Sequence, residues 1–175
     1  SQAYQKQYGL QTVNLLLANL YGPGDDFRDQ TSHVIPALIK KIEFAKSNGL
    51  KSIEVWGDGS PTRDFLFVRD AARAILNALM SEKVQEVSPI NVATGIETSI
   101  KEVVEILTEN LAFEGEVVYD TSKPNGQPIR VLDVNKALSE LDFVANTSLS
   151  EGITETIEYF FSKKQEIETL TRKYD

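Results

Sequence analysis

The chain has 175 residues, of which 41% are apolar, 25% charged and 9% aromatic; this ordinary globular composition excludes collagen and a fully disordered chain. Its 18 basic and 26 acidic residues give a net charge of −8, which would repel a polyanion, so nucleic acid is not an expected partner. With no cysteine and one histidine, the chain lacks the ligands of disulfide frameworks, iron–sulfur clusters and ordinary zinc sites, and we expect no metal site.

Short apolar runs alternate with amphipathic segments along the sequence. The clearest helix signal is a capping box at Ser99 and Glu102, followed by apolar residues at helical spacing. Gly9 and Gly49 are typical of helix C-termini. In chain order we expect the end of a helix at 1–8, a strand at 12–17, a helix at 32–47, a strand at 53–56, a helix at 68–79, a strand at 90–93, a helix at 99–111, a strand at 116–119, and helices at 133–140 and 148–162.

This order of elements predicts an α/β protein with at least some parallel strands, because helices connect successive strands. No internal repeat, low-complexity tract or Pro/Ser-rich linker divides the chain. No apolar run approaches the roughly 18 residues of a membrane span, and no signal segment is recognisable. The sequence therefore predicts a soluble, cytoplasmic protein without a membrane partner.

Several motifs of known enzyme sites are absent. Neither the three spaced glycines of a dinucleotide-binding turn nor a P-loop occurs, so the sequence predicts no phosphate cradle of these kinds. No Gly-x-Ser-x-Gly segment accompanies His33, which disfavours a serine-hydrolase relay. Tyr159 and Lys163 have the Tyr-x-x-x-Lys spacing of short-chain dehydrogenases, but no strand with a serine precedes them, and we interpret the spacing as coincidental.

Four segments carry a family resemblance: Asn-Leu-Tyr-Gly-Pro at 19–23, Ser-His-Val-Ile-Pro at 32–36, Trp-Gly-Asp-Gly-Ser-Pro-Thr-Arg-Asp-Phe at 56–65, and Asn-Val-Ala-Thr-Gly at 91–95. Together they resemble the C-terminal half of the extended short-chain dehydrogenase/reductases, the NAD(P)-dependent nucleotide-sugar epimerases and dehydratases. The run 32–38 and the segment Ser-Lys-Pro-Asn-Gly-Gln-Pro-Ile-Arg-Val-Leu-Asp at 122–133 narrow the resemblance to the GDP-L-fucose synthases of that family.

The resemblance implies the C-terminal part of an extended Rossmann-type fold with a small mixed α/β substrate-binding domain. Residues 1–30 would end the dinucleotide-binding fold, and residues 31–175 would be mainly the substrate-binding domain, with strand 90–95 returning to the main sheet. The family's N-terminal half carries the glycine-rich loop, a catalytic Ser and the Tyr-x-x-x-Lys pair. We therefore expect the NAD(P)-binding half to be absent and this chain alone to be inactive.

Cofactor and catalytic roles follow from the same resemblance. Ala18, Asn19 and Leu20 would lie against the nicotinamide end of NADP or NAD, NADP being preferred, at the carboxyl end of a strand. The simpler alternative is that Asn19 only caps a turn. His33 resembles the family histidine that contacts the cofactor side of the active site and acts as an acid during epimerisation. Without the resemblance, His33 would be interpreted as a surface or capping residue.

Substrate contacts are also implied by the resemblance. Arg63 follows the turn 57–61, so its guanidinium can project from a fixed backbone and pair with a diphosphate, although an exposed ion pair is the simpler alternative. Lys41 stands where fucose synthases usually carry arginine, and Asn125 where they carry aspartate. Trp56 would flank the nucleotide sugar or, alternatively, pack in the core. The full set assigned to the substrate is Val34, Lys41, Trp56, Arg63, Asn125 and Arg130.

The implied function is the nucleotide-sugar-binding portion of an NAD(P)-dependent epimerase and reductase, with a GDP-sugar as the favoured substrate. The full-length enzyme would invert C3 and C5 of GDP-4-keto-6-deoxymannose and reduce C4, and would form a homodimer. Two alternatives stay open. One is a fragment of another nucleotide-sugar epimerase or dehydratase, and the other is a non-catalytic module that binds sugar nucleotides.

Overall fold

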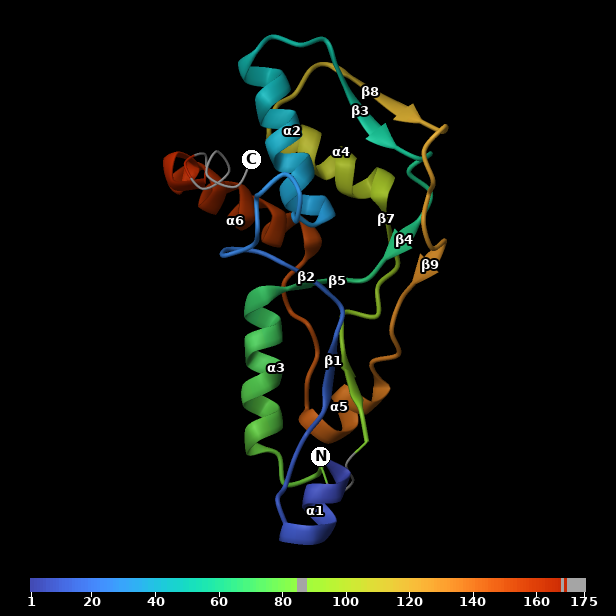
Figure 1. Cartoon of the computed structure of the whole chain (residues 1–175), viewed down its shortest axis with the longest axis vertical. Helices are drawn as coiled ribbons and strands as arrows, with labels where there is room; N and C mark the ends of the chain where they lie inside the picture. Colours follow the sequence, from blue (N-terminus) through green and yellow to red (C-terminus); the bar gives the residue numbers. More distant parts are fainter. Residues whose placement is uncertain (85–87, 168, 170–175) are drawn as a thin grey trace.

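The computed structural model describes residues 1–84, 88–167 and 169. Its helices are α1 (Gln2–Tyr8), α2 (Val34–Ser47), α3 (Val68–Met80), α4 (Ile100–Asn110), α5 (Asn135–Leu141) and α6 (Leu149–Ser162). Its strands are β1 (Leu15–Leu17), β2 (Asn19–Tyr21), β3 (Ser52–Trp56), β4 (Thr62–Arg63), β5 (Phe65–Phe67), β6 (Ile90–Val92), β7 (Thr98–Ser99), β8 (Glu116–Asp120) and β9 (Ile129–Arg130). Figure 1 shows an elongated molecule in which these elements gather in two groups.

Most strand pairs are parallel, as expected when helices connect successive strands. β1 pairs with β6, β2 with β5, and β3 with β8, all in parallel. A small three-stranded sheet has the order β7–β4–β9, in which β7 is antiparallel to β4 and β9 is parallel to it. This small sheet lies beside the site described below.

The two groups of elements surround separate hydrophobic cores. The upper core lies among α2, β3, α4 and α6, and the lower core among α3, β6 and α5 (Figure 1). The β2–β5 pair lies between the two cores and contributes to both. Successive side chains of a strand point to opposite faces. Phe65 and Phe67 accordingly pack in the upper core, whereas Leu66 packs in the lower core. The short strands between the cores therefore fix the positions of both.

The structure confirms the predicted helices to within a few residues, including the capping box of α4, in which Ser99 and Glu102 bond reciprocally. The single strand predicted at 12–17 is wrong in extent. The strand begins only at Leu15. After Ala18 the chain leaves β6 and pairs with the segment of β5: Ala18 N donates to Val92 O at 3.0 Å, whereas Asn19 N donates to Asp64 O at 3.2 Å. The division into domains at residue 30 stays a prediction. Among the described residues, none of the helices is both long and apolar enough to cross a membrane.

Candidate functional site

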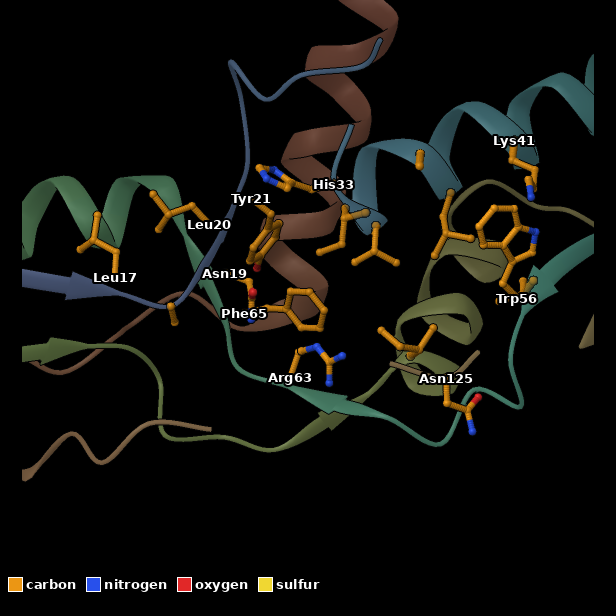
Figure 2. A pocket seen from close by; sticks show the side chains of 17 residues that line it. Leu17, Asn19, Leu20, Tyr21, His33, Lys41, Trp56, Arg63, Phe65 and Asn125 are labelled. Atoms are coloured by element: carbon orange, nitrogen blue, oxygen red, sulfur yellow. The ribbon is translucent and has the colours of Figure 1, made fainter. Parts of the chain in front are cut away.

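A cavity of about 680 Å³ opens between the two cores, at the carboxyl ends of β1 and β3, where α/β proteins commonly bind ligands. Figure 2 shows its side chains converging from α2 on one side and from β4 and β5 on the other. The lining is mostly apolar with a few polar groups, as is usual for small-molecule sites. It consists of Leu17, Ala18, Asn19, Leu20, Tyr21, His33, Val34, Ile35, Ala37, Leu38, Lys41, Val55, Trp56, Arg63, Phe65, Ile100 and Asn125.

Helix α2 presents one face to the cavity. Val34, Ala37, Leu38 and Lys41 follow one another at the spacing of a helix face, so apolar side chains line the cavity near the helix start and an ammonium stands one turn further along. The ammonium of Lys41 donates to the backbone carbonyl of Glu54 at 2.8 Å. That bond ties α2 to β3 and fixes a positive charge at the cavity edge.

Arg63 is held in place by backbone carbonyls. Its Nη1 donates to Thr62 O at 2.7 Å and to Gln127 O at 2.6 Å. Nε and Nη2 form no hydrogen bond within the described part of the chain, so they are available to a ligand. In Figure 2 the guanidinium lies beneath Phe65 at the edge of the cavity. A fixed guanidinium with unused donors is suited to bind a phosphate or carboxylate.

The residue after Arg63 anchors this strand. Asp64 is 1% exposed, and its carboxylate accepts hydrogen bonds from Thr94 N at 2.9 Å, Thr94 Oγ1 at 2.7 Å and Gly95 N at 2.9 Å. A buried carboxylate needs such partners, because an unpaired one would be costly. Asp64 thus joins the strand of Arg63 to the loop after β6. No role was predicted for Asp64 from the sequence, although the Arg-Asp-Phe motif contains it.

The other end of the cavity carries the only tryptophan. Trp56 is 65% exposed, so the interpretation as a core residue is wrong, and the Lys123 ammonium lies 5.8 Å from the ring centroid. Lys41 lines the same cavity (Figure 2). Asn125 Oδ1 accepts the N–H of Asp58 at 2.8 Å, which joins the loop after β3 to the loop after β8. An exposed ring with an ammonium near its face is a suitable surface for a base or a sugar.

At the β1 end, the polar side chains already have partners. Asn19 Nδ2 donates to Asp64 O at 2.8 Å, so its amide nitrogen joins the start of β2 to the residue after Arg63, 45 positions away in sequence, rather than capping a turn. Its Oδ1 accepts no hydrogen bond from the described residues. The His33 side chain is 73% exposed, and its Nδ1 lies 3.4 Å from Asp25 Oδ1.

The structure brings together every residue predicted for the site except Arg130. Arg130 lies on β9 in register with Arg63, and its carbonyl accepts the Asp64 N–H at 3.1 Å, but it does not line the cavity. The roles assigned to all these residues stay predictions. The apolar lining residues Ala37 and Leu38 of α2 were missed, although the spacing from Val34 to Lys41 could have indicated them.

The Tyr-x-x-x-Lys spacing on α6 is not part of the cavity. Tyr159 packs against Phe27, and Lys163 pairs with Glu166. Across residues 1–84, 88–167 and 169, no cluster of three or more His, Asp or Glu side chains is arranged to hold a metal.

The sequence model of the NAD dependent epimerase/dehydratase family matches residues 1–93. The GDP-L-fucose synthase of Sinorhizobium fredii is 40% identical over 161 residues, covering 92% of this chain and 50% of that protein. A GDP-L-fucose synthetase structure from Naegleria fowleri bound to NADP has a TM-score of 0.84 at 30% identity, covering 94% of this chain and 51% of its own. A UDP-glucose 4-epimerase structure from Thermotoga maritima with UDP-glucose has a TM-score of 0.80 at 27% identity, covering 93% and 50%. The chain therefore spans about half the length of the proteins it matches.

Proposed function

Because this chain belongs to the NAD dependent epimerase/dehydratase family, we propose that it forms the nucleotide-sugar-binding portion of an epimerase and reductase similar to GDP-L-fucose synthase. The full enzyme would invert C3 and C5 of GDP-4-keto-6-deoxymannose and reduce its C4 carbonyl. The observation that carries the proposal is the cavity, which has a held guanidinium at one side and an exposed tryptophan at the other.

The chemistry of the cavity suits a nucleotide sugar. Its volume of about 680 Å³ falls within the roughly 300–1,000 Å³ typical of small-molecule sites. Arg63 and Lys41 would neutralise the diphosphate, and Trp56 would flank the nucleotide. Val34 would contact the substrate through its apolar surface, and Asn125 through the loop that it holds. Arg130, one strand away from Arg63, would add positive charge around an otherwise acidic molecule.

The nicotinamide end of NADP, or of NAD as the less favoured cofactor, would lie against Ala18, Asn19, Leu20 and His33. These residues fit that group, because Ala18 is small and the Asn19 Oδ1 is unused within the described residues. When bound, the cofactor supplies a hydride for the C4 carbonyl. His33 would donate a proton during the exchanges at C3 and C5, since an imidazole can transfer protons near neutral pH.

The remaining cofactor contacts would come from an N-terminal half such as the relatives possess, without which the chain would be inactive. An exposed apolar stripe on α3, made of Ile75, Leu76, Leu79 and Met80, supports this proposal, because large contiguous apolar patches usually mark contact surfaces. We expect the full enzyme to be a cytoplasmic homodimer.

The direct test is a titration of this chain with nucleotide sugars, in which the fluorescence of its only tryptophan reports binding. GDP-mannose should bind, and Arg63→Ala should weaken its binding about 10- to 100-fold, because about 1.5–3 kcal/mol of charge-assisted hydrogen bonding is lost. The matched control is Arg69→Ala, which removes an exposed guanidinium of α3 that is paired with Glu155 of α6, and it should leave the affinity unchanged. Equal affinities of the Arg63→Ala variant and the unaltered chain would contradict the proposal.

The same titration separates the main alternative. Lys41, which replaces the usual arginine, and the similarity to a UDP-glucose 4-epimerase leave another nucleotide sugar open. UDP-glucose or dTDP-glucose binding more tightly than GDP-mannose would favour a sister epimerase or dehydratase. Binding of all three, with no activity after an N-terminal half is supplied, would favour a non-catalytic module.

A further inference from the structure

One acidic side chain next to the cavity has no role in the function proposed above. Asp25 lies in the loop between β2 and α2, and its backbone N–H donates to Gly22 O at 3.1 Å. Its side chain is only 9% exposed, whereas that of its neighbour His33 is 73% exposed. The pair therefore combines a buried carboxylate with an imidazole that solvent and ligands can reach.

The hydrogen bonds of Asp25 are concentrated on one oxygen. Oδ1 accepts the N–H of Asp26 at 2.8 Å and lies 3.4 Å from Nδ1 of His33. Oδ2 is buried and has no hydrogen-bond partner in the described part of the chain. Buried polar atoms without partners are rare, and they often occur next to functional groups. The carboxylate is thus held by the loop with its accepting oxygen directed at the imidazole.

This contact constrains the imidazole. A carboxylate can only accept hydrogen bonds, so a bond to Asp25 requires the proton of a neutral His33 to be on Nδ1. Nε2 is then the nitrogen with a free lone pair. Because His33 lines the cavity at the N-terminus of α2, Nε2 is the nitrogen left for a ligand or for proton exchange.

We propose that Asp25 is a positioning residue for His33: it holds the ring through Nδ1–H, so that the proton given to the substrate leaves from Nε2 of the imidazolium and the ring remains as the neutral Nδ1–H tautomer. The importance of this tautomer for epimerisation rests on the proposed function. The tautomer itself does not, because it can be measured without a ligand. Its failure is therefore distinguishable from a failure to bind nucleotide sugars.

The test is ¹⁵N NMR of the chain labelled at histidine, in buffer at about pH 9, where an ordinary imidazole is neutral. Only one imidazole is present, so the two ring-nitrogen signals need no assignment to a residue. The unaltered chain should have the proton mainly on Nδ1. Asp25→Asn and Asp25→Ala should both shift the population toward Nε2–H, the second variant by removing the acceptor altogether.

The matched control is Asp29→Asn, which removes a charge from the same loop but from a carboxylate paired with Lys40. It should leave the tautomer unchanged. The proposal is overturned if the unaltered chain has the proton mainly on Nε2, or if neither Asp25 variant changes the populations while the chain stays folded. Loss of GDP-mannose binding alone would bear on the proposed function and not on this pair.

Discussion

The two regions differ in where a helix places its large aliphatic side chains. In the upper region, α4 buries them in the core, whereas in the lower region α3 buries alanines and exposes its large aliphatic side chains. In α4, Val103, Val104 and Leu107 are almost completely buried. In α3 the buried side chains are Asp70, Ala71, Ala74 and Ala78, while Ile75, Leu76, Leu79 and Met80 are 42–83% exposed. Both helices are amphipathic, so their sequence patterns are equally good helix signals.

The difference shows that amphipathic spacing predicts a helix but not which of its faces this chain covers. Alanines allow α3 to lie close to β5 and β6 in the lower core. The opposite face is left as an apolar stripe, with Leu16 on the nearby β1 also 52% exposed. The large side chains of α4 in the upper core are thus covered by the described residues, whereas the α3 side of the lower core has an apolar surface without a cover among them.

The largest expected effect contrasts two leucines on these helices. Leu107→Ala should reduce the free energy of unfolding by about 2–5 kcal/mol, because a fully buried side chain leaves a cavity. Leu79→Ala should change it by less than about 0.5 kcal/mol, because Leu79 is 78% exposed. Urea unfolding of both variants measures the contrast. Similar losses would mean that the α3 stripe is covered in the isolated chain.

A second prediction concerns the link between the two regions. Asp70 on α3 accepts hydrogen bonds from Arg73 and from the backbone N–H groups of Asn146 and Thr147, just before α6. Burial opposes its charged form, but these hydrogen bonds outweigh burial and hold the pKa of Asp70 below its usual value. A lowered folded-state pKa stabilises the fold above the unfolded-state pKa of about 3.9 and ceases to do so as the pH falls through the folded-state value.

Asp70→Asn should therefore reduce the free energy of unfolding by about 1.5–3 kcal/mol near neutral pH, the worth of hydrogen bonds to a charged group. The difference from the unaltered chain should shrink below about pH 4, where the unaltered chain loses the same contribution. Urea unfolding across this pH range provides the measurement. The control Asp142→Asn removes an exposed carboxylate paired with Lys83 and should have little effect. A difference independent of pH would show that the charge of Asp70 does not stabilise the link.

Local signals predicted the longer elements well. Capping residues, helical spacing and apolar runs act within a few residues, so α2, α4 and β3 were predictable. The short strands β2, β4, β5, β7 and β9 were missed, because each depends on pairing with a segment distant in sequence. Phe65–Phe67, for example, forms a strand only because Asn19–Tyr21 lies beside it.

The site was predicted through motif resemblance rather than through spacing. Arg63, Trp56 and His33 belong to recognisable segments, and the fold brings them to one cavity. The groups that hold them were not predictable in the same way. Asp64 contacts Thr94, 30 positions away, and Asp25 reaches His33 only because the loop between them folds back. These contacts became visible only in the three-dimensional arrangement.

The smallest effect on stability, but a large one on association, is expected at the α3 stripe. Leu79→Gln combined with Met80→Gln should leave the free energy of unfolding within about 0.5 kcal/mol of its original value, since both side chains are exposed. The unaltered chain should self-associate as its concentration rises, and the double variant should require about tenfold more protein, because less apolar surface is buried in the contact. Sedimentation velocity over a concentration series measures this.

Phe44→Gln combined with Phe161→Gln, which alters exposed aromatic side chains of the upper region, is the matched control and should associate like the unaltered chain. If the control reduces association and the α3 variant does not, the uncovered surface lies in the upper region, and the contrast between the two regions is wrong.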